Sequence, residues 1–114
     1  MKLKKKAIII SLASLKLSKH EISLLKKYLP WGIILFKRNI KNYNQLKELV
    51  FSIKKITKDK NYPILIDEEG GEVSRLQNII NNSLFFQRYF GKLFEDNSKL
   101  GSSIYEYYMN EICI

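Results

Sequence analysis

The sequence predicts an α/β fold built on parallel strands, because short apolar runs alternate with amphipathic helical segments. Three β-branched runs, near residues 7–12, 32–36 and 63–66, are separated by two segments whose apolar residues recur at helical spacing. A strand–helix–strand–helix–strand order implies right-handed crossovers between parallel strands. Periodicity leaves two completions open, an open doubly wound sheet and a closed (β/α)8 barrel.

The three predicted strands are apolar at nearly every position. Such runs are typical of strands that are covered on both faces, as in a parallel sheet. The four lysines before the first run also give the start of the chain the look of a secretory signal. That apolar stretch is short and is broken by Ser11 and Ser14, so a buried first strand over residues 7–12 is the better interpretation.

Local signals place the helices. The first is expected to begin at Ser18, with Glu21 at the spacing of a capping box, and to end before Pro30. The second is expected to begin at Asn42. A less regular aromatic stretch then precedes a last helix, which is expected from about Asp96. The residues that this last helix is expected to bury are Leu100, Ile104, Tyr108 and Ile112.

Composition limits the class of protein. The chain has 114 residues, enough for one small domain, with 46% hydrophobic and 27% charged residues, an ordinary globular mixture. No apolar run approaches the roughly 20 residues that span a bilayer, so no membrane partner is expected. Cys113, the only cysteine, cannot form an internal disulfide and is expected to be buried.

The net charge of +9 raises the question of nucleic-acid binding. Only three of the 20 basic residues are arginines, whose planar fork suits bidentate contacts to phosphates and guanines. The lysines are scattered along the chain rather than clustered. We therefore expect solvated basic faces and no nucleic-acid partner.

The most informative segment follows the third strand, where Asp67, Glu68 and Glu69 precede the pair Gly70 and Gly71. Glycine permits positive φ and the close approach of a ligand to the backbone. A carboxylate at a strand end can accept hydrogen bonds from neighbouring sugar hydroxyls, and an arginine in the following loop can donate to the same ring. By composition alone, an ordinary acidic turn explains the segment equally well.

A catalytic carboxylate pair is the sharper hypothesis for this segment. If the strand continued, Asp67 and Glu69 would lie about 6–7 Å apart on one face, within the range of glycosidase acid and base pairs. The Gly-Gly turn is expected to direct Glu69 away from Asp67, which disfavours the pair. A magnesium site made of the same acids has no further support, so neither a metal nor another cofactor is expected.

Two motifs resemble glycoside hydrolase family 3, in particular its bacterial β-N-acetylhexosaminidases. Residues 31–40, WGIILFKRNI, are similar to the family segment G-x-I-L-F-x-R-N, and residues 66–76, IDEEGGEVSRL, to I-D-x-E-G-G-x-V-x-R-L. The motifs occur in the family order with one helix between them. The resemblance implies that residues 1–114 are the N-terminal portion, about three βα units, of an incomplete (β/α)8 TIM barrel.

The resemblance also implies a function. Family members remove β-linked N-acetylglucosamine from cell-wall muropeptide fragments in the cytoplasm, with retention of configuration. By the motif, Asp67 would hold sugar hydroxyls and Arg75 would bind the substrate. Glu69, Gly70 and Gly71 match positions that shape the loop.

The chain departs from the family where catalysis is concerned. The later Lys-His-Phe-Pro-Gly-type segment, the acid/base histidine and the aspartate nucleophile have no counterpart among the 114 residues. The only histidine, His20, is expected to be a solvated residue of the first helix. The sequence therefore contains no assigned catalytic residue, and we expect no turnover from this chain alone.

One alternative from another functional class is a small basic α/β binding module without catalysis. Its glycine loop would be the obvious phosphate site. The loop has neither the G-x-x-x-x-G-K-[ST] nor the G-x-G-x-x-G pattern, and its three acids would repel phosphate. A carbohydrate partner is therefore favoured. Because the apolar strands are built to be paired and covered, the isolated chain is expected to be poorly soluble or oligomeric.

Overall fold

The structure is a computed structural model that describes residues 4–112, so Cys113 lies outside the described residues. The chain divides into two compact units. Unit 1 comprises the described residues up to Glu68 together with Arg75–Asn81. Unit 2 comprises Glu69–Ser74 and the described residues from Asn82 onward. Each helix of residues 4–112 is too short or too polar to cross a bilayer.

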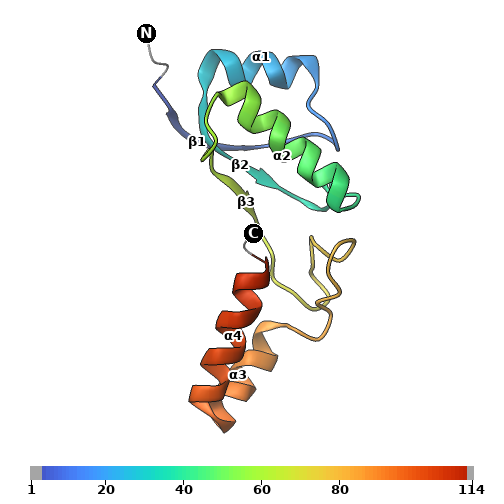
Figure 1. Ribbon diagram of the computed structural model, residues 1–114, viewed down its shortest axis with the longest axis vertical. Coiled ribbons are helices and arrows are strands. Elements are labelled where there is room, and N and C mark those ends of the chain that lie inside the picture. Colours follow the sequence, from blue (N-terminus) through green and yellow to red (C-terminus); the bar gives the residue numbers. More distant parts are fainter. Residues whose placement is uncertain (1–3, 113–114) are drawn as a thin grey trace. The chain divides into compact units, whose positions relative to one another are not determined.

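Unit 1 is a small parallel α/β layer structure. Its sheet has the order β1 (Lys6–Ser11), β2 (Pro30–Leu35), β3 (Ile64–Ile66), and both strand pairs are parallel. The two crossovers contain α1 (Lys19–Tyr28) and α2 (Tyr43–Thr57), which contact one another and cover the sheet (Figure 1). The predicted alternation of strands and helices and the parallel pairing are therefore confirmed for this part of the chain.

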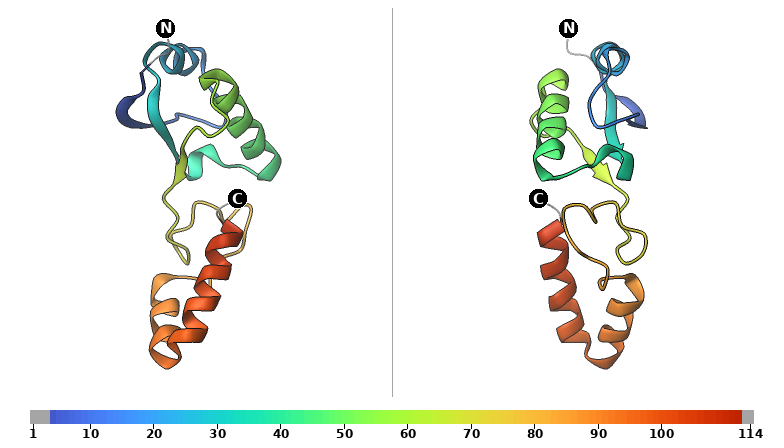
Figure 2. Two further views of the ribbon diagram at one scale, coloured as in Figure 1. Left: turned by 60° about the vertical axis from the view of Figure 1, so that its left-hand side comes forward. Right: turned by 90° about the vertical axis from the view of Figure 1, so that its right-hand side faces the viewer.

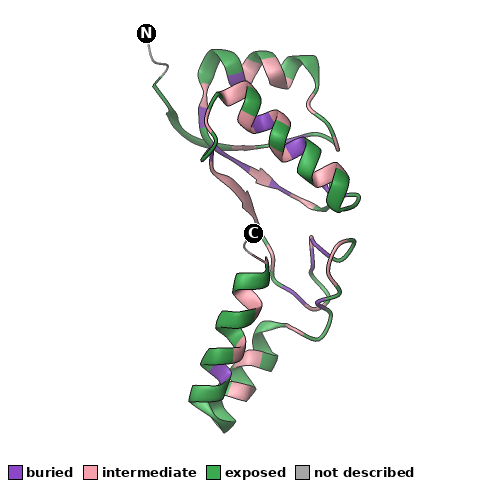
Figure 3. Cartoon of the chain, in the orientation of Figure 1, coloured by how far each residue is buried: buried purple, intermediate pink, exposed green. Residues whose placement is uncertain are grey.

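One apolar core joins the two helices of unit 1 to the sheet. On β2, Ile33 and Leu35 are buried and alternate with half-buried Ile34, so two side chains of one strand face the helices. The buried residues of unit 1 gather where α1 and α2 pack on the strands (Figure 3). The members of this core are Leu12, Leu25, Ile33, Leu35, Leu49, Ile53 and Tyr62.

The predicted start of α1 is confirmed in detail. Ser18 Oγ accepts a hydrogen bond from Glu21 N at 3.2 Å, and Ser18 N donates to Glu21 Oε2 at 2.7 Å, which completes the capping box. Glu21 Oε1 also accepts from Ala13 N at 2.9 Å, so the same carboxylate holds the loop before the helix. Burial opposes ionisation, but these backbone donors outweigh it and lower the pKa of Glu21.

The end of α1 differs slightly from the sequence expectation. The helix stops at Tyr28, and Leu29 adopts a left-handed conformation with φ of 42° while its N–H bonds to Leu25 O at 3.2 Å. Pro30 then begins β2 rather than merely ending the helix. The start of α2 is as expected, because Asn42 Oδ1 accepts from Gln45 N at 2.9 Å.

The prediction that the first strand is buried is wrong. Strand β1 forms, but it lies at one edge of the three-stranded sheet and pairs only with β2. Ile8 is 54% exposed and Ile9 is 45% exposed, although successive residues point to opposite faces of a strand. Both faces of β1 are therefore open in the described part of the chain. An apolar run identifies a strand but does not tell an edge position from a central one.

Unit 2 contains a helical hairpin (Figure 2), in which the expected last helix is present and is preceded by a helix that the sequence analysis did not predict. The stretch expected to be less regular contains a separate helix, α3 (Gln87–Asp96), followed by α4 (Ser98–Ile112). Asn97 lies between them, and its Oδ1 caps α4 by accepting from Leu100 N at 3.0 Å. No side chain caps α3 at Phe86, so the usual sequence signal of a helix start is absent. Leu100 is 48% exposed, so its predicted burial is also wrong.

The helices of unit 2 are held together by an aromatic cluster and by close packing of their backbones at one point. Gly101 is buried, and an added Cβ would lie 2.8 Å from Phe94 Cα, so the two helix backbones pack closely there. Most aromatic ring pairs are tilted or edge-to-face, with centroids 5.0 to 6.2 Å apart. The rings in the cluster are those of Phe85, Tyr89, Phe90, Tyr105 and Tyr108.

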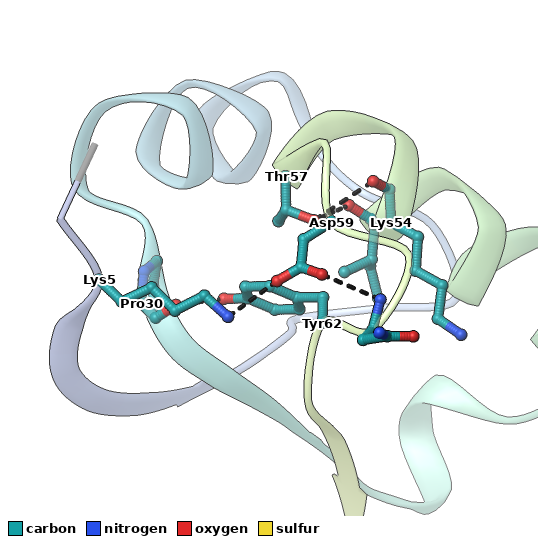
Figure 4. A network of polar contacts seen from close by, with 8 residues as sticks. Lys5, Pro30, Lys54, Thr57, Asp59 and Tyr62 are labelled. Atoms are coloured by element: carbon teal, nitrogen blue, oxygen red, sulfur yellow. Dashed lines mark hydrogen bonds and ion pairs between the residues drawn. The ribbon is translucent and has the colours of Figure 1, made fainter. Parts of the chain in front are cut away.

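A polar network fastens the start of the chain to the turn before β3 (Figure 4). Lys5 Nζ lies 2.8 Å from Asp59 Oδ2 and 5.4 Å from the centre of the Tyr62 ring. The hydroxyl of Tyr62, a residue that is only 2% exposed, donates to Pro30 O at 2.6 Å. The ion pair is partly solvated and contributes little, so the buried hydroxyl is the stronger anchor.

Replacing Tyr62 with phenylalanine removes this hydroxyl alone. We expect the free energy of unfolding of unit 1 to fall by about 1 kcal/mol near neutral pH. Burial and, second, the carboxylate of Asp59 raise the pKa of Tyr62 above its ordinary value of 10.0. The unfolded state therefore loses its proton first, and the contribution of the phenol to stability is lost as the pH rises above 10.0.

Urea denaturation followed by the fluorescence of Trp31, the only tryptophan, measures this effect. The wild-type chain should be more stable than Tyr62→Phe near neutral pH, and the difference should shrink as the pH rises above 10.0. Comparing the two proteins at each pH removes the titration of the lysines, which they share. A difference that stayed constant across this range would contradict the assignment.

Candidate functional site

The candidate site lies at the C-terminal edge of the unit 1 sheet, where parallel strands bring their following segments together. Asp67 follows the last residue of β3 directly and is exposed. Its predicted position at the end of the third parallel strand is thus observed. Strands β1 and β2 end at the same edge of the sheet. The segments that follow these two strands are joined by side-chain hydrogen bonds.

Asn39 forms the main connection between the ends of β1 and β2. Its side chain is fully buried, at 0% exposure. Its Nδ2 donates to Leu12 O at 3.0 Å and to Ser14 O at 2.9 Å, and its Oδ1 accepts from Phe36 N at 2.9 Å. Arg38 Nε donates to the same Leu12 oxygen at 2.9 Å. The Arg-Asn pair of the first motif therefore supports the strand ends in this structure.

Two further amides extend this support. Gln45 Nε2 donates to Leu15 O at 2.8 Å and to Asn39 O at 3.1 Å, while its Oε1 accepts from Lys41 N at 2.8 Å. Asn78 Nδ2 donates to Ile40 O at 3.3 Å, which joins the segment after β2 to residues that follow the acidic loop. The backbone at this edge is thus held by amide side chains, which titrate at no accessible pH.

The Gly-Gly pair makes a tight turn, as its residue type suggests. Gly70 and Gly71 have φ of 75° and 61°, and Gly70 forms an isolated antiparallel bridge with Val73. A Cβ on Gly70 would lie 2.1 Å from Phe85 O, and one on Gly71 would lie 2.8 Å from Phe86 Cβ. The close approach that requires glycine here is therefore to the chain itself, whereas the sequence suggested an approach to a ligand.

Asn82 anchors this turn within unit 2 and was not identified from the sequence. It is 1% exposed, and its carbonyl oxygen accepts from Gly71 N at 3.2 Å and from Phe85 N at 2.9 Å. Its Nδ2 donates to the hydroxyl of Tyr108 at 3.3 Å. No local pattern marks it, because an asparagine in a polar stretch is most simply explained as part of a loop.

Within unit 1, Glu68 brings the two ends of the acidic loop together. Its Oε2 accepts hydrogen bonds from Arg75 N at 2.8 Å and from Leu76 N at 2.9 Å. The backbone of Arg75 thus returns to the residue next to Asp67. No ion pair joins Asp67 to Arg75 in the part of the chain that the structure describes. The sequence singled out Asp67 and Arg75 and missed the glutamate that connects their segments.

The remaining titratable candidates are not assembled for catalysis. Asp67 and Glu69 are both exposed and lie outside any strand, so the ladder that would have set their spacing stops at Ile66. His20 is exposed in the first turn of α1. Residues 4–112 contain no group of three or more His, Cys, Asp or Glu side chains that could hold a metal ion.

Comparison with known proteins adds sequence relatives. The β-hexosaminidase of Haemophilus influenzae is 38% identical over 71 residues, which are 62% of this chain and 20% of that protein. That of Shewanella frigidimarina is 41% identical over 70 residues, again 20% of its length. The chain thus spans about a fifth of the length of the curated relatives that it matches. No family model matches the chain.

Solved structures give the same relationship. NagZ from Neisseria gonorrhoeae in complex with N-trifluoroacetyl-D-glucosamine matches 62% of this chain at 36% identity, with a TM-score of 0.56, over 20% of its own chain. NagZ from the same organism in complex with zinc ion matches 87% of this chain at 26% identity, with a TM-score of 0.67, over 29% of its own chain. These similarities show that the chain is related to the N-terminal part of the glycoside hydrolase family 3 β-hexosaminidases.

Proposed function

We propose that residues 1–114 form the N-terminal portion of a (β/α)8 barrel domain, and that in a complete enzyme they help to hydrolyse terminal β-linked N-acetylglucosamine. Three parallel strands in sequential order, with both helices packed on the sheet, support this proposal, because such a barrel is built from consecutive strand–helix units. The open edge strand β1 supports this proposal, because a barrel strand pairs on both sides.

The contribution of this chain is substrate capture rather than bond cleavage. Asp67 projects from the C-terminal end of a strand, the face on which barrel enzymes build their sites. An exposed carboxylate can accept hydrogen bonds from two adjacent sugar hydroxyls, and the guanidinium of Arg75 can donate to ring substituents. No residue of the described chain is placed as an acid/base or a nucleophile, so we propose that the 114 residues have no turnover by themselves.

The single observation that carries the proposal is the strand-end position of Asp67 together with the return of the Arg75 backbone to Glu68. One related structure is a complex with N-trifluoroacetyl-D-glucosamine, which makes N-acetylglucosamine the appropriate probe. The resemblance further supports muropeptide fragments as the natural substrate and the cytoplasm as the place of action, and both belong to the proposal.

The proposal predicts weak but localised sugar binding by the isolated chain. Titration of the 15N-labelled protein with N-acetylglucosamine should shift the backbone amides of residues 67–76. Asp67→Asn and Arg75→Ala should each lower the affinity by about tenfold or more, because each removes a charged hydrogen-bonding partner.

Glu72→Gln is the matched control, because Glu72 is an exposed acid of the same loop and has no assigned role in sugar binding. It should bind like the wild-type chain, which separates a loss of specific contacts from a change in the charge of the loop. Shifts that appeared elsewhere in the chain, or equal affinity in all four proteins, would contradict the sugar-site assignment.

A further inference from the structure

The side chain of Glu68 points back into the fold while its two acidic neighbours are solvent-exposed. Asp67 and Glu69 are exposed, whereas Glu68 is half-buried. Its Oε2 accepts from two consecutive backbone amides, Arg75 N at 2.8 Å and Leu76 N at 2.9 Å. Leu76 itself is buried, at 7% exposure. The three consecutive acids therefore differ in environment. Glu68 binds the backbone of the protein, whereas Asp67 and Glu69 face solvent.

The geometry is that of a loop closed at its base. Hydrogen bonds from backbone N–H groups to an ionised carboxylate are roughly twice as strong as neutral ones. Two of them converging on one oxygen fix both the position and the direction of the backbone at residues 75 and 76. Six residues separate Glu68 from Arg75, which is more than a helical hydrogen bond spans, and neither residue lies in a strand. Within unit 1, the carboxylate of Glu68 therefore holds the backbone of Arg75 directly.

We infer that Glu68 is a positioning residue for Arg75, and that its carboxylate fixes the backbone from which the guanidinium reaches the sugar held by Asp67. The inference rests on the proposed function for the identity of the ligand, but not for the contact itself. Glu68 touches neither sugar nor reacting atoms in this account. Its effect on sugar binding passes through Arg75.

Hydrogen–deuterium exchange on the 114-residue chain tests the contact directly. In the wild-type chain the amides of Arg75 and Leu76 should be protected, and in Glu68→Ala they should exchange about tenfold faster or more. Glu68→Gln retains an acceptor oxygen and should restore part of the protection. Glu72→Ala, which changes an exposed acid of the same loop, should leave the exchange of both amides unchanged. The amides of α2 show in each variant whether unit 1 remains folded.

The effect on Arg75 is tested by sugar affinity. Glu68→Ala should weaken N-acetylglucosamine binding about tenfold, Glu68→Gln should recover part of this loss, and Glu68→Ala should have no further effect in an Arg75→Ala background. Unchanged exchange at residues 75 and 76 in both Glu68 variants would overturn the inference. Faster exchange with unchanged affinity would overturn the positioning role and leave only a structural one.

Failure of the proposed function has a different signature. If the wild-type chain bound no N-acetylglucosamine, the sugar assignment and the positioning role toward that sugar would both fall. The exchange rates would still decide whether Glu68 holds the backbone of Arg75.

Discussion

Gly70→Ala is expected to lower the stability of unit 2 by roughly 3–4 kcal/mol, from left-handed strain and from overpacking. Gly70 has φ of 75°, where a side chain is strained regardless of the space available. The space is also absent, because the new Cβ would lie 2.1 Å from the carbonyl oxygen of Phe85. Backbone must therefore move in the turn or at Phe85, and Phe85 belongs to the aromatic cluster.

Gly91→Ala is the matched control in the same unit. Gly91 lies inside α3, and an added Cβ would meet no atom within 4 Å. This substitution should stabilise α3 by about 0.5–1 kcal/mol, because glycine is a poor helix former. Thermal unfolding followed by the near-ultraviolet circular dichroism of the tyrosines measures both variants. Equal melting temperatures for Gly70→Ala and Gly91→Ala would show that the turn does not have the observed conformation.

Asn39→Ala should lower the free energy of unfolding of unit 1 by about 3 kcal/mol. The substitution removes three hydrogen bonds of 2.9 to 3.0 Å at a site with 0% exposure. It leaves Phe36 N and Ser14 O without the partner that the amide provides, and a buried polar group without a partner costs about 1–3 kcal/mol. Leu12 O keeps its bond from Arg38, which limits the loss.

Asn44→Ala provides the comparison for the same change in residue type. Asn44 is exposed in the first turn of α2, so its replacement should change stability by no more than about 0.5 kcal/mol. Urea denaturation followed by Trp31 fluorescence reports on unit 1 in both variants. A loss at Asn39 as small as that at Asn44 would mean that the strand ends are not held by this amide.

Most of unit 1 could be predicted from the sequence because its signals are local. The capping box at Ser18 and the N-cap at Asn42 each need only four residues, and the apolar runs that mark the strands are short. The burial of β1 could not be predicted, because the place of a strand in a sheet depends on neighbours that the run does not describe. Helix α3 was not predicted because Phe86, the residue before it, provides no capping side chain and because the helix contains Gly91.

The candidate site was predictable only in part. The position of Asp67 follows from the end of an apolar run, and the turn at Gly70 follows from the residue type. The roles of Glu68, Asn39 and Asn82 could not be predicted, because each depends on a partner 7 to 27 residues away. Contacts at such separations are set by the fold, and a single sequence carries no pattern for them.

The most direct test of the sugar-site account is the kcat/KM of a chimera in which this chain replaces the N-terminal part of the Haemophilus influenzae β-hexosaminidase. The substrate is a chromogenic aryl β-N-acetylglucosaminide, and a cooperative thermal melt establishes that each protein is folded. We expect an active chimera whose kcat/KM falls on the order of 100-fold on Asp67→Ala, falls comparably on Arg75→Ala, and does not change on Glu72→Ala. A folded, active chimera that kept its kcat/KM after both Asp67→Ala and Arg75→Ala would contradict it.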